Sequence, residues 1–132
     1  FGYTRCPDVC PTSLQSMALA LDALGPIGHR ITPVFVTVDP ERDTPKAMAD
    51  YVSFFSPRFI ALSPSAEQLA RLAKEWRVTY KRVDVKERDA YLIDHTATIF
   101  FVDPSGSVIG RFPHDLDARA LADRIRAAML KN

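Results

Sequence analysis

The chain has 132 residues, 47% of them hydrophobic and 25% charged, which is the balance of a single globular domain. Its 17 Lys and Arg residues against 16 Asp and Glu residues give a net charge of +1, which argues against a nucleic-acid-binding protein. The longest apolar runs, residues 17–21 and 99–102, are far too short to cross a bilayer. With two cysteines, the chain is too poor in sulfur for a disulfide-stapled fold. We therefore expect one domain over residues 1–132.

The first half of the chain shows clear helix and strand signals. A capping-box pattern at residues 12–15 predicts the start of a helix that Gly25-Pro26 ends. Residues 31–38 are mostly apolar and rich in β-branched side chains, which predicts a buried strand. Thr44-Pro45 then predicts the start of a second helix, which is expected to end at residue 56 because Pro57 follows.

The second half continues the alternation. A second capping box opens a predicted helix over residues 65–76. Residues 96–112 predict a hairpin with its turn at residues 103–106, and Asp117 predicts the cap of a last helix that runs to about residue 130. Strands that alternate with helices indicate an α/β fold, with a parallel sheet between helices and an antiparallel hairpin at one side.

The two cysteines are the clearest chemical signal. Cys6 and Cys10, with three residues between them, follow what looks like a strand end at residues 1–4 and lead into a helix N-terminus. The helix dipole and the neighbouring Arg5 favour the thiolate form. Such a pair can close a disulfide or bind one soft metal, whereas zinc and iron–sulfur clusters usually need four strong ligands. The spacing alone leaves a redox dithiol and half of a metal site open.

A third ligand would come from one of the three histidines. His29 and His114 lie in predicted loops and are expected to be solvated. His95 precedes a strongly apolar strand, where a lone histidine is more often structural than a ligand. Asp94 beside it could orient its ring.

Three motifs in the same order resemble the Sco/SenC family: FGYTRCPDVCP at residues 1–11, VTVDPERDTP at residues 36–45, and Asp94-His95. Members of this family are thioredoxin-fold copper chaperones for cytochrome c oxidase assembly. The resemblance therefore implies a thioredoxin-like fold, with a central mixed β-sheet flanked by helices.

The resemblance also implies the site. It places the copper ligands on Cys6, Cys10 and His95, with Asp94 and Arg5 next to them. Arg5 stands where family members often carry histidine, which alters the charge near the thiolates and leaves the ligand set unchanged. The spacer between the cysteines is one residue longer than in a C-x-x-C reductase, which favours metal handling over general thiol exchange.

By the same resemblance, the cofactor is copper, as Cu(I) or Cu(II), and the expected function is its delivery to the binuclear copper site of cytochrome c oxidase subunit II. The implied partners are subunit II and another copper chaperone or a thioredoxin-like reductant. A thiol–disulfide reductase that keeps the cysteines of that site reduced is the alternative, and a redox or copper sensor is a third possibility. The implied location is the periplasmic side of a bacterial inner membrane or the mitochondrial intermembrane space.

The family also has a membrane anchor and first strands upstream of the region that this chain matches, so we expect both to precede residue 1. The strand that ends at Tyr3 is then expected in the middle of the sheet. Residues 1–132 by themselves are expected to be poorly stable, because the loss of a central strand exposes two rows of backbone hydrogen-bonding groups.

The motif at residues 39–45 has a simpler explanation than catalysis. Asp-Pro followed by Thr-Pro is a good strand-to-helix connection. Arg42 is expected to pair with Asp39 or Asp43 and to fix this loop.

Overall fold

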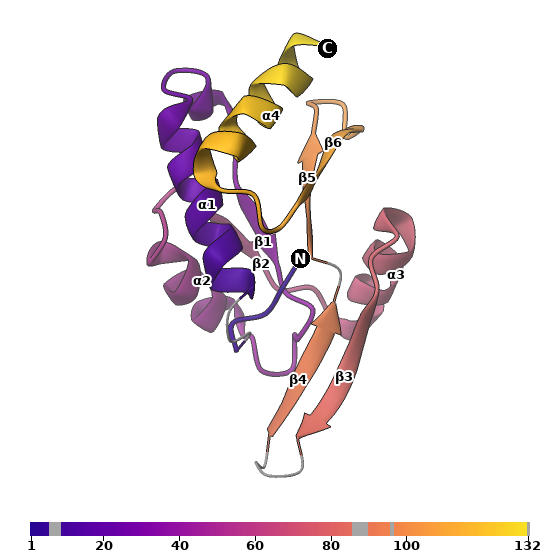
Figure 1. The fold of residues 1–132 in the computed structure, drawn as a ribbon. Helices are drawn as coiled ribbons and strands as arrows, with labels where there is room; N and C mark the ends of the chain where they lie inside the picture. Colours follow the sequence, from indigo (N-terminus) through magenta and orange to yellow (C-terminus); the bar gives the residue numbers. More distant parts are fainter. Residues whose placement is uncertain (6–8, 86–89, 96, 132) are drawn as a thin grey trace.

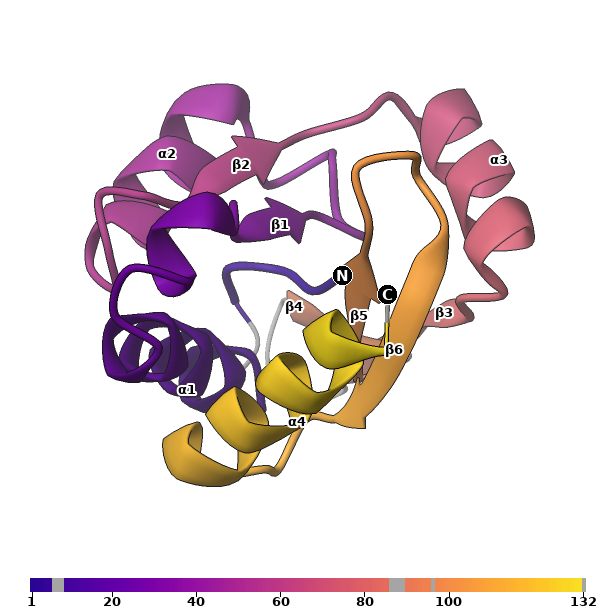
Figure 2. The ribbon, with the colours of Figure 1, turned by 90° about the horizontal axis from the view of Figure 1, so that it is seen from above.

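A computed structural model describes residues 1–5, 9–85, 90–95 and 97–131. Figure 1 shows the elements along the chain, and Figure 2 shows them from above. In order, they are α1 (Val9–Ala23), a short 3-10 helix (Gly28–Arg30), β1 (Val34–Val36), α2 (Pro45–Ser53), β2 (Ile60–Leu62), α3 (Ala66–Trp76), β3 (Tyr80–Val85), β4 (Ala90–His95), β5 (Thr98–Val102), β6 (Val108–Pro113) and α4 (Ala118–Leu130).

The strands pair in both senses, as the predicted mixed sheet requires. β1 and β2 are parallel, whereas β3 with β4 and β5 with β6 form antiparallel pairs. Gly2 adds a parallel bridge to Thr37, just beyond β1, which agrees with the predicted strand end at residues 1–4. Among the described residues, the strands form two-stranded pairs instead of one continuous sheet.

Two hydrophobic clusters of buried residues hold α1, α2 and α4. α1 and α4 lie side by side in both views, and the buried side chains between them include Leu21, Leu121 and Ile125. A second cluster joins α1 to α2 and β1 through Leu14, Met48 and other apolar residues. The α1 helix therefore contributes buried side chains to both of these clusters.

The helix starts agree with the sequence at three of the described helices. Thr44 caps α2, Ser65 caps α3 in a full capping box, and Asp117 caps α4. The first helix differs, because α1 begins at Val9 and the predicted cap Thr12 lies inside it. Pro11 is tolerated there, since the N–H groups of the first helical turn have no acceptor within the helix. The capping-box pattern at residues 12–15 was thus misleading.

The strands differ more from the sequence prediction than the helices do. The regular part of the predicted strand at residues 31–38 is only β1, and the predicted strand at residues 96–102 begins as β5 at Thr98, with Thr96 outside the described residues. The β3–β4 pair was not predicted as a hairpin at all. It extends away from the helices in Figure 1 as a ribbon of two strands.

A large cavity lies between β1 and β5. Its volume is about 1010 Å³, with residues 31–36 on one side, residues 97–104 on the other, and side chains of α1 and α4 between them. At its border the rings of Phe1, Trp76 and Phe100 contact one another, with centroids 6.3 Å apart for Phe1–Trp76, 6.1 Å for Phe1–Phe100 and 5.4 Å for Trp76–Phe100. These rings connect the first residue of the chain to α3 and β5.

Candidate metal centre

The predicted ligands lie at the ends of two elements. Cys10 is the second residue of α1, and His95 is the last residue of β4, paired with Tyr80 of β3. Cys6 lies outside the described residues, as do the side chains of Cys10, Asp94 and His95. Their assignment as copper ligands therefore stays a prediction, and the structure contributes the position of the backbone that carries Cys10 and His95.

The start of α1 is electrostatically suited to a thiolate. The backbone N–H groups of the first turn lack helical acceptors, and the described first turn contains no acidic residue to offset the positive end of the helix dipole. Arg5 lies in an exposed turn just before the motif and adds a positive charge nearby. Both features lower the cost of a negative charge on Cys10.

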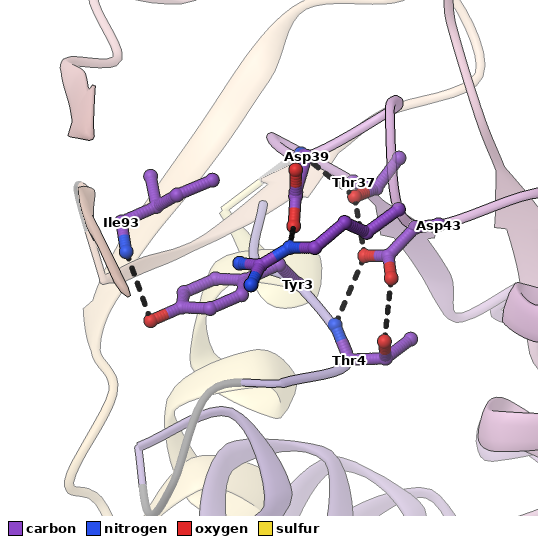
Figure 3. Close-up of polar contacts among 7 residues, drawn as sticks. Tyr3, Thr4, Thr37, Asp39, Asp43 and Ile93 are labelled. Atoms are coloured by element: carbon purple, nitrogen blue, oxygen red, sulfur yellow. Dashed lines mark hydrogen bonds and ion pairs between the residues drawn. The ribbon is translucent and has the colours of Figure 1, made fainter. Parts of the chain in front are cut away.

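A direct hydrogen bond joins the two predicted halves of the site. The hydroxyl of Tyr3 accepts a hydrogen bond of 3.1 Å from the backbone N–H of Ile93, as Figure 3 shows. Both residues are buried and pack in one cluster with Val38 and Leu69. The segment that leads into Cys6 is therefore in contact with β4 close to its His95 end.

A buried carboxylate fixes the same segment from the other side. Asp43 is fully buried, and its side chain accepts hydrogen bonds from the backbone N–H of Thr4 (3.0 Å), from the hydroxyl of Thr4 and from the hydroxyl of Thr37 (2.7 Å). A carboxylate that accepts three donors is a strong local constraint, because each of these bonds has a charged acceptor. Asp43 thus holds Thr4, two residues before Cys6.

The loop after β1 is fixed as the sequence predicted. Arg42 forms a salt bridge with Asp39, whose side chain is almost completely buried. The backbone N–H of Asp39 in turn donates a hydrogen bond of 2.9 Å to the hydroxyl of Thr37. These contacts confirm the loop-fixing role of Arg42.

The sequence did not show the roles of Tyr3 and Asp43. Both lie inside the motifs that carry the family resemblance, so a signal was present. An Asp that follows a strand is, however, equally typical of an ordinary turn, and its three partners come from segments far apart in sequence or across the loop. Burial was the missing information.

The other two histidines lie away from these contacts. His29 is exposed in the 3-10 helix, as expected for a solvated loop residue. His114 is half-buried in the loop before α4, and its backbone carbonyl accepts a hydrogen bond of 3.1 Å from the hydroxyl of Ser13. Among the side chains that the structure describes, no three His, Cys, Asp or Glu residues gather as a metal site.

Among the described carboxylates, that of Asp103, in the turn between β5 and β6, has a clearly shifted pKa. The hydroxyl of Ser105 and the backbone N–H groups of Ser107 and Ser105 donate hydrogen bonds to Asp103, which lowers the pKa of this side chain below 3.8. These hydrogen bonds all lie within the turn of the β5–β6 hairpin, and none of them involves a residue of the candidate site.

Similarity to known proteins places this arrangement in a class. The strands β1 to β6 and the helices α1 to α4 form a thioredoxin-like α/β domain, as in the solved structures described below. Cys10 lies at the N-terminus of α1. A family model described as SCO1/SenC matches residues 1–130. The chain belongs to the SCO1/SenC family.

Relatives of known name extend over nearly all of this chain. It is 39% identical to protein sco1 of Schizosaccharomyces pombe over 95% of its length, and 35% identical to a SCO2-like protein of Rickettsia typhi over 96%. The chain covers 49% of the first protein and 63% of the second. It thus spans about half to three fifths of the length of these relatives.

Solved structures of similar proteins share the fold. ScoI of Bradyrhizobium japonicum with copper bound is 38% identical, with a TM-score of 0.86 over 97% of this chain and 81% of that one. ScoI of Arabidopsis thaliana with copper bound is 33% identical, with a TM-score of 0.93 over 100% and 82%. Yeast Sco1 with copper bound is 30% identical, with a TM-score of 0.89 over 100% and 74%.

Among the described helices, none combines the length and the apolar character that crossing a membrane requires.

Proposed function

We propose that this domain binds copper through Cys6, Cys10 and His95 and delivers it to the binuclear copper site of cytochrome c oxidase subunit II. The observation that carries this proposal is the similarity to three copper-bound Sco structures, each 30% or more identical and each matched over at least 97% of this chain. The family motifs are present at the positions of all three ligands.

The donor set suits this metal. Two thiolates are soft ligands that favour Cu(I), and an imidazole extends the set to Cu(II) with water as a further ligand. The start of α1 and the nearby Arg5 favour the thiolate of Cys10. Because His95 ends a different element from the one that carries Cys10, it can separate from the metal without disturbing α1, which suits a protein that must release its cargo.

A thiol–disulfide reductase is the second candidate, and the position of Cys10 at a helix N-terminus favours it. In that reaction one thiolate attacks the disulfide of a partner, and the second thiol then resolves the mixed disulfide. The partner gains two electrons and two protons, and this domain is left with a Cys6–Cys10 disulfide. Such a reaction has no need of His95.

Copper binding is tested by an anaerobic Cu(I) titration of the reduced domain in competition with a chelator of known affinity. We expect one copper per chain in the reduced protein and none in the disulfide form, because the same two sulfurs cannot bond to each other and bind the metal. Bound Cu(I) should protect both thiols from alkylation, which mass spectrometry measures. Equal alkylation of the copper-loaded and metal-free proteins would remove the cysteines from the site.

Delivery and reduction are separated by the His95→Ala variant. Copper transfer to the isolated copper domain of subunit II should be impaired in this variant, whereas reduction of that domain's disulfide should continue. Turnover of the disulfide without any copper transfer by the unmodified domain would favour the reductase. Stable copper binding without either reaction would favour the sensor.

The proposed place of action is the periplasmic side of a bacterial inner membrane or the mitochondrial intermembrane space. A mitochondrial SCO2 homologue of Bos taurus, 37% identical over 98% of this chain, supports the second location. A further copper chaperone is the proposed source of the metal, and a thioredoxin-like reductant is the proposed source of electrons for the two thiols.

A further inference from the structure

We propose that Tyr3 is a positioning residue that sets the His95 end of β4 against the segment that leads into Cys6. The inference rests on the proposed ligand set and deepens it. It assigns the relative placement of the two halves of the site to one buried phenol and to the carboxylate of Asp43, which fixes the segment that carries the phenol.

The contact between the two halves is short and buried. Tyr3 is 2% exposed and Ile93 is 8% exposed, and the phenol oxygen lies 3.1 Å from the backbone nitrogen of Ile93. Because the bonded atom of Ile93 belongs to the main chain, the contact fixes the path of β4 itself. His95 follows two residues later, about 7 Å further along an extended strand.

The phenol acts from a fixed base. On one side of Tyr3, the N–H of Gly2 donates to the carbonyl of Val36 (3.0 Å), and the N–H of Val38 donates to the carbonyl of Gly2 (2.7 Å). On the other side, Asp43 accepts the backbone N–H of Thr4. Because the backbone on both sides of Tyr3 is hydrogen-bonded, the phenol has little freedom to move. The bond to the phenol therefore determines the position of β4 at Ile93.

The bond from Ile93 to Tyr3 attaches β4 to the body of the domain. It pairs with β3 over its whole length, and the two strands extend from the body as a ribbon in Figure 1. A two-stranded ribbon is marginally stable without packing. Ile93 is the residue of β4 whose side chain the structure describes, and it packs in a buried cluster that contains Tyr3.

Tyr3→Phe is the matching test variant, since it removes the hydroxyl and keeps the buried ring. The expected result is a loss of Cu(II) affinity of about fivefold, corresponding to one buried hydrogen bond. Cu(I) affinity should change less, because two sulfur ligands dominate it. Tyr51→Phe is the control, since Tyr51 packs between Phe35 and Phe55 in the cluster around α2.

A double-mutant cycle with His95→Ala shows whether Tyr3 acts through His95. If it does, Tyr3→Phe weakens Cu(II) binding in the unmodified protein and has no further effect once His95 is alanine. The Cu(II) electron paramagnetic resonance spectrum should change in the same pattern. An equal loss in both backgrounds, or no loss in either, would overturn the proposal.

A readout without metal keeps this proposal separate from the proposed function. In the copper-free protein, Tyr3→Phe should accelerate hydrogen exchange of the Ile93 amide at least about fivefold, whereas Tyr51→Phe should not. If the unmodified domain bound no copper, the proposed function would be wrong. If Tyr3→Phe did not accelerate exchange of the Ile93 amide, the positioning role would be wrong, whether or not the domain binds copper. Thermal unfolding of each variant verifies that it is folded.

Discussion

The segment that leads into Cys6 and the strand that leads into His95 are held in opposite ways. The first is fixed by backbone bonds between Gly2 and β1 and by the buried carboxylate of Asp43. The second belongs to a two-stranded ribbon that extends from the body, and of the β4 side chains that are described, that of Ile93 packs in the cluster with Tyr3. Residues 2–4 are thus bonded to the core on both sides, and β4 is attached to them through Ile93.

This difference bears on how a metal could be held and released. Ligands on a rigid base keep their geometry when the metal leaves, so they can bind again without a cost in reorganisation. A ligand on a marginal ribbon can move by itself. We therefore expect the cysteines to determine the affinity for Cu(I). We expect His95 to affect the affinity for Cu(II) and the release of the metal.

The largest expected effect is the loss of either sulfur. Cys6→Ser and Cys10→Ser should each weaken Cu(I) binding by more than about a hundredfold, because a hydroxyl is a poor ligand for a soft metal. Competition with a Cu(I) chelator measures the affinity. A variant that keeps the affinity of the unmodified protein would show that the rigid side does not supply that sulfur.

The next effect concerns stability on the rigid side. Asp43→Ala removes the buried acceptor of three donors, two of them part-buried on Thr4 and one buried on Thr37, and should lower the free energy of unfolding by about 3 kcal/mol in urea denaturation. Asp117→Ala, which removes the cap of α4, is the control, with an expected loss of about 1 kcal/mol. Equal losses in the two variants would mean that Asp43 is no more than an ordinary cap.

His95→Ala should have a smaller effect than either cysteine variant. We expect Cu(I) affinity to fall by less than about tenfold, with a greater fall for Cu(II), because imidazole is a better ligand for the harder ion. The sulfur-to-copper absorption band of the Cu(II) form should shift. An unchanged band together with unchanged affinity would contradict a three-ligand site.

The smallest effect needs no mutation. Amide hydrogens of the β3–β4 ribbon should exchange faster than the N–H of Val38, which donates to Gly2, because a marginal ribbon opens locally while the rigid side opens with the whole domain. Exchange monitored by nuclear magnetic resonance provides the rates. Comparable protection in both regions would remove the contrast between the two sides.

Local signals in the sequence predicted the helices well. Thr44, Ser65 and Asp117 each bond to a backbone N–H within the next turn, so the relevant interaction lies within four residues. The same rule failed at Thr12, because the chain was already helical from Val9 and a threonine inside a helix has the same neighbours as one at its start.

Long-range contacts were beyond the sequence. The bond between Tyr3 and Ile93 joins residues 90 positions apart, and that between Thr4 and Asp43 joins residues 39 apart. Periodicity and capping patterns describe residues that are close in sequence, so they cannot predict pairs that only the folded chain brings together. The family resemblance predicted the fold, which the solved structures confirm, and a ligand set that stays a prediction. The structure adds the bond between Tyr3 and Ile93, which joins the segments that lead into Cys6 and His95.

The rings at the border of the cavity give the molecule a built-in optical probe. Trp76 is the one tryptophan in the sequence, so its emission belongs to a single place. It touches Phe1, the first residue of the rigid segment, and Phe100 of β5. A displacement of that segment changes the polarity around the indole and shifts its emission wavelength. Fluorescence spectroscopy therefore reports the placement of residues 1–4 without an added label.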